Sequence, residues 1–410
     1  MSDKTILVIG TYDTKDDELG FLANMIREQG GQVVTMDVSV LGDPSKPCNF
    51  AKHDVASEGG SSIQAAIDSG DENKAMQIMA KGASLLAARL HREGRFDGMI
   101  VLGGTMGTDL ALDVASALPL GVPKYIVSTV SFSPLIPAER LAADTQMILW
   151  AGGLYGLNSV CKASLSQAAG AVLGAARAVQ LPDPNKPLIG MMSLGTSALK
   201  YVIPLKPALE ERGFEVAVFH ATGMGGRSFE SLAAQGAFAC VFDFCTQELG
   251  NHLNGSNISA GADRLTNAGA NGTPQIVAPG CYDLVDVVGW QPIADKWDKH
   301  LKHAHNRLLT SIVLEAAETK LVAQAHVYRL AHAKGPVEII LPTHGLGEWD
   351  REGADLHNPD GLAAFLAELE ASLPDNIQAH RLACHINDAE FADKALEIFD
   401  GWCADGTVVS

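Results

Sequence analysis

The sequence predicts an α/β protein with two Rossmann-like, doubly wound lobes, mostly parallel sheets and an interlobe cleft. Short apolar runs alternate with longer helical patterns along the chain, as is typical of parallel strands covered by helices. The chain has 410 residues, 47% of them hydrophobic, and this length exceeds what one ordinary core accommodates. Prolines at 182, 184 and 187 interrupt the pattern, which then starts again. We therefore expect lobes at residues 1–180 and 188–410, joined by a linker at 181–187.

In the first lobe, apolar runs predict strands at residues 5–9, 32–37, 98–102, 124–128 and 147–151. Helical periodicity predicts helices at residues 16–29, 61–68, 73–92, 106–118 and 156–180. Residues 41–60 contain Pro44 and Pro47, and we expect a long loop there.

The second lobe follows the same scheme. We expect strands at residues 188–193, 214–219, 239–242, 275–278 and 337–341. The expected helices cover residues 196–212, 228–235, 306–333 and 389–403, of which 306–333 is the longest.

The composition excludes several classes of protein. The net charge of −18 and the pI near 5.1 disfavour binding to nucleic acid or to an anionic membrane. No apolar run reaches the ~18 residues of a membrane-spanning helix, and the first residues form a strand pattern rather than a secretion signal. Seven cysteines without a C-x-x-C motif indicate free thiols in a reducing compartment. We expect a cytoplasmic protein without a metal site made by its own side chains.

The first chemical motif follows the first expected strand, where open α/β sheets bind their ligands. It comprises Gly10, Thr11, Asp13, Thr14 and Lys15. Glycine allows close backbone approach, threonine hydroxyls donate to phosphate oxygens, and free helix N–H groups attract anions. The alternative is an ordinary helix cap made by Asp13 or Thr14.

The second motif connects the strand at 98–102 to the next helix. It contains Gly103, Gly104, Thr105, Gly107 and Thr108, so several backbone N–H groups could meet one phosphate. The alternative is a tight turn that needs positive φ angles. Because two such loops follow neighbouring strands, we favour a phosphate site.

A third motif, rich in hydroxyl groups, follows the strand at 124–128. Thr129 and Ser131 could complete a phosphate or ribose pocket, or they could form a turn before Pro134.

Polar groups also follow the strands of the second lobe. His220, Asp243 and Glu248 could form a general acid/base set, and Arg227 could bind an anionic substrate group. The alternatives are a hydrogen-bonded strand-end histidine and a solvated arginine. Another strand-end loop carries His344.

The ordered set of motifs resembles the Tm-one-like ATP-binding domain family, long catalogued as an uncharacterised protein family. The motifs are G-T-Y-D-T-K, G-G-T-M-G-T, S-T-V-S, H-A-T-G-M-G-G-R, D-F-C-T-Q-E-L and C-H-I-N-D. The family includes the N-terminal part of a tomato tobamovirus-resistance protein. The resemblance covers nearly the whole chain and implies a two-lobe fold, ATP binding with Mg²⁺, and self-association as a homo-oligomer. Met106 and Phe132 are bulkier than the family pattern, which could narrow the pocket or change the nucleotide.

The resemblance implies a nucleotide site at Thr11, Asp13, Thr14, Gly103, Gly104, Thr105, Gly107, Thr108 and Thr129. We hypothesise an ATP- and Mg²⁺-dependent enzyme that holds the nucleotide in the first lobe and a small anionic metabolite in the interlobe cleft. The alternative is a non-catalytic nucleotide-binding module that acts through protein partners, since no Walker motif occurs. An NAD-dependent oxidoreductase is disfavoured because no G-x-G-x-x-G follows the first strand.

Overall fold

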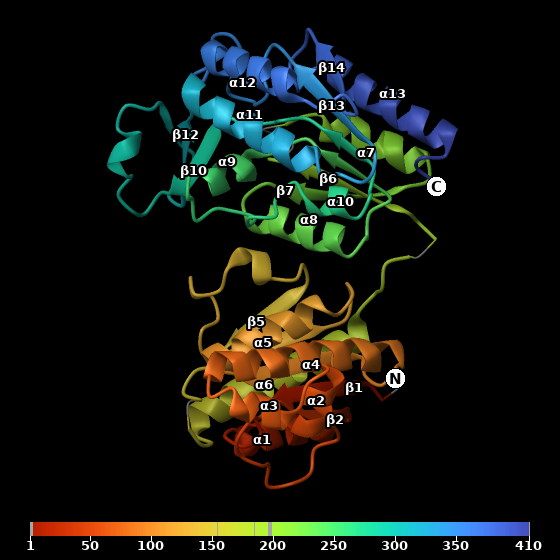
Figure 1. Ribbon diagram of the computed structural model, residues 1–410, viewed down its shortest axis with the longest axis vertical. Helices are drawn as coiled ribbons and strands as arrows, with labels where there is room; N and C mark the ends of the chain where they lie inside the picture. Colours follow the sequence, from red (N-terminus) through yellow and green to blue (C-terminus); the bar gives the residue numbers. More distant parts are fainter. Residues whose placement is uncertain (1–2, 154, 184, 196–198, 410) are drawn as a thin grey trace. The chain divides into compact units, whose positions relative to one another are not determined.

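The computed structural model describes residues 3–153, 155–183, 185–195 and 199–409. The chain divides into two compact units, Met1–Pro182 (unit 1) and Asp183–Ser410 (unit 2). Both units contain a parallel sheet with helices on its faces, so the predicted α/β fold class is confirmed (Figure 1). No helix in the described residues is long and apolar enough to cross a membrane.

Unit 1 is built on a five-stranded parallel sheet with the order β2-β1-β3-β4-β5. Its strands are β1 (Thr5–Gly10), β2 (Gln32–Asp37), β3 (Gly98–Gly103), β4 (Lys124–Ser128) and β5 (Thr145–Leu149). Its helices are α1 (Asp16–Glu28), α2 (Lys52–Glu58), α3 (Ile63–Asp68), α4 (Glu72–Arg92), α5 (Thr105–Ser116), η1 (Ala138–Arg140) and α6 (Ser159–Ala178). The direction in which successive strands are added to the sheet reverses between β1 and β3. Open α/β sheets bind their ligands at this topological switch point.

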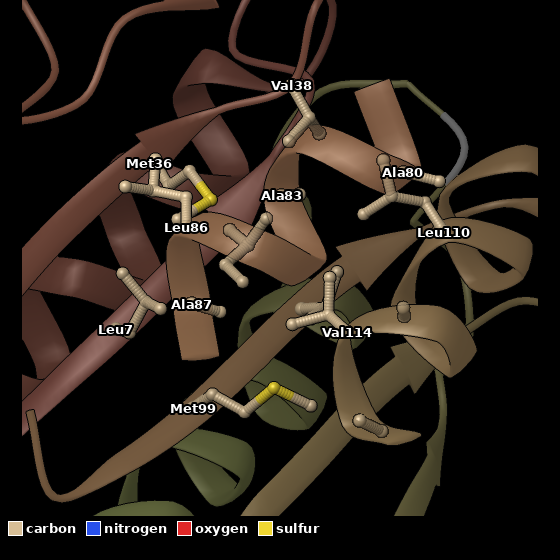
Figure 2. Close-up of a cluster of buried hydrophobic side chains, with 14 of the residues drawn as sticks. Leu7, Met36, Val38, Ala80, Ala83, Leu86, Ala87, Met99, Leu110 and Val114 are labelled. Carbon is tan, nitrogen blue, oxygen red and sulfur yellow. The ribbon is translucent and has the colours of Figure 1, made fainter. Parts of the chain in front are cut away.

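Two apolar layers hold the unit 1 sheet between its helices. Successive side chains of a strand point to opposite faces, so Ile6 and Val8 pack with α1 and α6. Leu7 and Ile9 pack on the other face with α4 and α5. Figure 2 shows this second layer, in which side chains of β1, β2 and β3 meet Leu86 of α4 and Val114 of α5. The layers fix the strand ends that carry the polar loops.

Unit 2 contains a six-stranded parallel sheet with the order β14-β13-β9-β8-β6-β7 and a three-stranded antiparallel sheet with the order β10-β12-β11. The strands are β6 (Leu188–Ser193), β7 (Glu215–His220), β8 (Cys240–Asp243), β9 (Gln275–Val277), β10 (Leu284–Val288), β11 (Lys302–Ala304), β12 (Leu309–Val313), β13 (Val337–Pro342) and β14 (Gln378–Leu382). The helices are α7 (Val202–Glu211), α8 (Met224–Ala234), α9 (Gln247–Leu253), α10 (Asn267–Ala270), η2 (Asp295–Trp297), α11 (Ala316–Leu330), α12 (Pro359–Ser372) and α13 (Ala389–Asp405). Helices α11 and α12 pack against each other (Figure 1).

Two sequence predictions of local structure are wrong. The expected loop at 41–60 contains α2, whose first turn is closed by Asp54 through a hydrogen bond from the Ala51 N–H. The expected helix at 306–333 begins only at Ala316, because Leu309–Val313 is a strand that pairs with β10 and β11. The expected helix at 196–212 begins with residues 196–198, which lie outside the described residues, and α7 covers Val202–Glu211.

Candidate functional site

A cavity of about 850 Å³ opens at the switch point of the unit 1 sheet, beyond the carboxyl ends of β1 and β3. This volume lies within the range of small-molecule sites, about 300–1,000 Å³. The two predicted glycine- and threonine-rich loops both reach it. From those loops it is lined by Thr11, Asp13, Thr14, Lys15, Gly103, Gly104, Thr105, Met106 and Gly107.

The start of α5 presents open backbone donors to this cavity. Gly104 is the N-cap, and the first N–H with an acceptor in the turn is that of Thr108, bonded to the Gly104 carbonyl at 2.9 Å. Within the described residues, the N–H groups of Thr105, Met106 and Gly107 have no acceptor. Such groups, together with the helix dipole, make an anion-binding position.

The adjacent glycines of this loop have different roles. A Cβ atom on Gly103 would lie 2.6 Å from the Gly107 Cα, so Gly103 is needed for β3 to pack against α5. A Cβ atom on Gly104 would meet only the Thr129 Oγ1, at 3.8 Å. A side chain therefore fits at Gly104 but would occupy space at the cavity wall.

Asp37, which the sequence analysis did not single out, holds the β1 loop in place. It ends β2 and is buried, and its Oδ1 accepts from the Tyr12 N–H at 3.3 Å and from the Ser39 N–H at 2.9 Å. The Ser39 hydroxyl in turn accepts from the Asp13 N–H at 3.0 Å. The position of Asp37, an acidic residue at the end of a strand, could have identified it in the sequence as a support of the glycine-containing loop.

Asp13, which lines the cavity, has one carboxylate oxygen bonded and one unsatisfied. Its Oδ2 accepts from the Gly42 N–H at 3.2 Å, whereas its Oδ1 is buried and has no hydrogen-bond partner in the described part of the chain. A buried carboxylate oxygen without a donor is costly, and a cation would relieve that cost. Among the residues that the structure describes, no group of three or more His, Cys, Asp or Glu side chains could hold a metal ion.

The remaining predicted residues of unit 1 support the loops rather than line the cavity. Gly10 packs under α1, where a Cβ atom would lie 2.7 Å from the Leu19 Cδ1. The Thr108 hydroxyl donates to the Gly104 carbonyl at 2.7 Å. The Thr129 N–H donates to the Gly103 carbonyl, and Ser131 is buried with its hydroxyl on the Ile148 carbonyl at 3.0 Å.

The other wall of the cavity is mostly apolar and was missed by the sequence analysis. It comes from the segment after β2 and from α3 and α4, whose residues look like ordinary core positions in the sequence. The side chains are Val38, Val40, Leu41, Ala66, Ile67, Ala75 and Met76, with Asp71 and Glu72 beside them.

In unit 2 the corresponding glycine-rich loop is already occupied by the protein itself. The Glu248 Oε1 accepts from the Gly223 N–H at 2.6 Å and from the Gly226 N–H at 3.1 Å, at the start of α8. A Cβ atom on Gly226 would lie 1.7 Å from the Glu248 Oε2. These glycines therefore make room for an internal carboxylate, which takes the place that a ligand anion would use.

Arg264 binds the other predicted carboxylate, Asp243, with nitrogen–oxygen distances of 2.5 and 2.7 Å. It also contacts the Glu248 Oε2 at 3.1 Å and the Glu230 Oε1 at 3.2 Å, and all four side chains are buried. Burial raises the pKa of Glu248 to about 7 and also raises the pKa of Glu230, while Arg264 acts in the opposite direction. The structure thus pairs the two predicted acids, Asp243 and Glu248, with a buried arginine and closes them to solvent.

His220 and Arg227 are not joined to that acidic pair. His220 is exposed, and its Nε2 lies 3.0 Å from the Leu194 carbonyl oxygen. Arg227 is buried and bonds Asp263 at 2.6 Å and the Ala260 carbonyl at 3.2 Å. Among the described residues, no hydrogen bond or ion pair connects His220 to Asp243 or Glu248.

Comparisons with known proteins agree with the resemblance seen in the motifs. The model of the uncharacterised protein family (UPF0261) N-terminal domain matches residues 4–181, and that of its C-terminal domain matches residues 186–403. A UPF0261 protein of Brucella melitensis is 53% identical over 404 residues, which is 98% of this chain and 97% of that protein.

A tomato (Solanum lycopersicum) protein described as ToMV resistance protein Tm-1 is 28% identical over 425 residues, covering 96% of this chain and 55% of that protein. Among solved structures, the S. aureus MnaA–UDP complex aligns with 67% of this chain and 79% of its own at 10% identity. Its TM-score is 0.22, which is too low to support any inference about this chain.

Proposed function

The chain belongs to the UPF0261 family, and we propose that its unit 1 cavity binds ATP together with Mg²⁺. The observation that carries the proposal is the set of open N–H groups at Thr105, Met106 and Gly107, which line a cavity at the switch point. A phosphate group satisfies such donors, and the helix dipole favours its charge.

The two walls of the cavity suit the two ends of a nucleotide. The loops after β1 and β3 offer hydroxyl groups of Thr11, Thr14 and Thr105 beside the open N–H groups. The opposite wall offers apolar side chains such as Val40, Ile67 and Met76, against which a base could pack. A free phosphate would leave this apolar wall without a partner, so the cavity fits a nucleotide better.

Asp13 is the residue that would contact Mg²⁺. The Asp13 residue lines the cavity, and its Oδ1 has no hydrogen-bond partner among the described residues. Mg²⁺ commonly takes one or two carboxylates together with nucleotide phosphates rather than an all-protein cage. Bound Mg²⁺ would neutralise phosphate charge beside this carboxylate.

Asp37 favours ATP over NAD as the ligand. In dinucleotide-binding sheets an acidic residue near the end of the second strand contacts the ribose hydroxyls. Here the Asp37 Oδ1 is held by the Tyr12 N–H and by Ser39, and the side chain is buried. It therefore shapes the phosphate loop instead of facing a ribose.

The proposal concerns nucleotide binding, since the acids expected to support catalysis in unit 2 are paired with Arg264. An ATP-dependent enzyme acting on a small anionic metabolite and a regulatory module acting through partners both follow from such binding. Consumption of ATP during incubation with pooled cell metabolites distinguishes them, because a regulatory module would bind ATP without turning it over.

Calorimetric titration of the full chain with ATP, with and without Mg²⁺, tests the proposal. We expect saturable binding of ATP that tightens with Mg²⁺, and much weaker binding of NAD under the same conditions. Absence of ATP binding, or tighter binding of NAD than of ATP, would overturn the proposal.

A further inference from the structure

Unit 2 contains a separate cavity, of about 520 Å³, at the ends of β13 and β14. Thr343 and His344 directly follow β13, and Arg381 lies near the end of β14. Arg351 and the first turns of α12 close the other sides. Because parallel strands direct ligands to their carboxyl ends, this is a position where a binding site is expected.

Two guanidinium groups at this cavity keep unused donors. The Arg381 Nη1 contacts both oxygens of Glu370, at 2.8 and 2.9 Å, and the Arg351 Nη2 contacts Asp388 at 2.7 Å. A guanidinium has five N–H donors, and within the described residues the other nitrogens of both groups have no acceptor. Each arginine is held by one carboxylate and can still bind a second.

Two imidazoles lie beside these guanidinium groups. His344 and His357 line the cavity and are exposed. In the part of the chain that the structure describes, neither ring has a hydrogen-bond partner. Each ring can donate a hydrogen bond to an oxyanion in the same space.

The two carboxylates at the cavity differ in their contacts. Asp350 is engaged, because its Oδ2 accepts from the Leu346 N–H at 2.6 Å and its Oδ1 lies 3.0 Å from the His385 Nε2. Glu352 is exposed and has no hydrogen bond or ion pair with another described residue. Glu352 therefore contributes an unpaired negative charge to the cavity that Arg351 and Arg381 line.

The floor of the cavity is apolar and small. It is formed by α12, with Pro359 at its first position and Leu362, Ala363 and Leu366 along the face toward the cavity. A short hydrocarbon body would pack there while a charged head reaches the arginines.

We propose that this cavity binds a small organic anion through Arg351 and Arg381, with its apolar body against α12. The head group is a carboxylate or a phosphate, since the planar fork of arginine matches both. The site differs from the acid/base set expected from the sequence, because its residues come from the C-terminal strands of unit 2. It also does not depend on nucleotide binding in unit 1.

The test uses the full chain with histidine-selective ¹⁵N labelling, in which His344 and His357 are assigned by their His→Gln variants. Butyrate, butyl phosphate and the neutral isostere butyramide are titrated separately. We expect at least one of the two anions to shift both resonances saturably, and butyramide to leave them unchanged. The stronger of the two anions identifies the head group.

Matched variants separate the site from nonspecific charge effects. Losing one charged hydrogen-bond donor should weaken anion binding about tenfold in Arg381→Gln and in Arg351→Gln. Both side chains belong to exposed pairs, so the variants should fold normally. Glu352→Gln should strengthen binding by removing a repelling charge. Arg307→Gln, in the turn between β11 and β12, is the control and should change nothing.

Three outcomes would overturn the proposal, and the first two concern the probes. One is the absence of a saturable shift with either anion, and the other is an equal shift with butyramide. Binding that persists unchanged in both arginine variants would also contradict it. The titration is repeated in Gly104→Val, where an unchanged result keeps this site separate from the unit 1 cavity.

Discussion

Replacement of Gly104 by valine should abolish nucleotide binding while leaving unit 1 folded. Gly104 lines the cavity and is the N-cap of α5, and a Cβ atom there would meet only the Thr129 Oγ1, at 3.8 Å. The side chain would therefore stand where a phosphate must approach the open N–H groups.

The expected loss of nucleotide affinity is much larger than the expected loss of stability. A hydrogen bond to a charged group contributes about 1.5–3 kcal/mol, so losing two N–H contacts to phosphate costs about 3 kcal/mol or more. That corresponds to a loss of affinity of at least about 100-fold. Valine is a poorer N-cap than glycine by about 1 kcal/mol or less. For a unit of this size the change lowers the melting temperature by about 2–4 °C.

Gly103→Ala is the matched control, because its Cβ atom would lie 2.6 Å from the Gly107 Cα. Such overpacking costs about 1–3 kcal/mol, so this variant should lose stability together with binding. Calorimetry with ATP and thermal unfolding measure both properties. ATP binding of normal strength by Gly104→Val would refute the placement of the nucleotide at α5.

Asp13→Asn should remove the tightening of ATP binding by Mg²⁺ in calorimetry and leave binding without Mg²⁺ intact. The control is Asp71→Asn, which changes another carboxylate of the same cavity and should keep the Mg²⁺ effect. Arg264→Met should lower the free energy of unfolding in urea by about 3–5 kcal/mol, because it leaves buried carboxylates without their cation. Arg212→Met, which breaks an exposed pair with Asp400, should cost less than about 1 kcal/mol, and equal losses would contradict the assignment. Burial raises the pKa of Glu248 from its ordinary 4.5 to about 7, so the folded state retains a proton that the unfolded state releases. The urea midpoint of the unsubstituted chain should therefore fall relative to that of Glu248→Gln as the pH rises from 4.5 to 7. A difference between the two midpoints that stays constant through this window would exclude the shift.

The loops of the unit 1 site could be predicted because they are local in sequence. Gly103, Gly104 and Thr105 stand directly between a buried strand and a helix, and so do Thr11 and Thr14. The strand order then brings both loops to one switch point, as the alternation of strands and helices indicates.

The apolar wall of the same cavity could not be predicted. Ile67 and Met76 follow the ordinary helical periodicity of core residues, and only the packing of α3 and α4 places them at the cavity. Likewise, β12 at residues 309–313 forms by pairing with β10 and β11, and such pairing cannot be inferred from local hydrophobic periodicity.

The acids of unit 2 show why a polar strand end is a weak signal of catalysis. Asp243 ends β8, and Glu248 lies in the first turn of α9, the next helix along the chain. Their partner, Arg264, comes from a later segment of small residues, so the buried ion pairs could not be predicted from local sequence patterns. Two glycine-rich loops of similar appearance thus differ, since α8 is capped by Glu248 and α5 has open donors.

Hydrogen–deuterium exchange with and without ATP and Mg²⁺ tests this difference most directly. We expect the nucleotide to slow exchange in peptides covering residues 11–15 and 104–108 and to leave residues 222–228 unchanged. Protection of residues 222–228 without protection of 104–108 would contradict the assignment of the nucleotide site to unit 1.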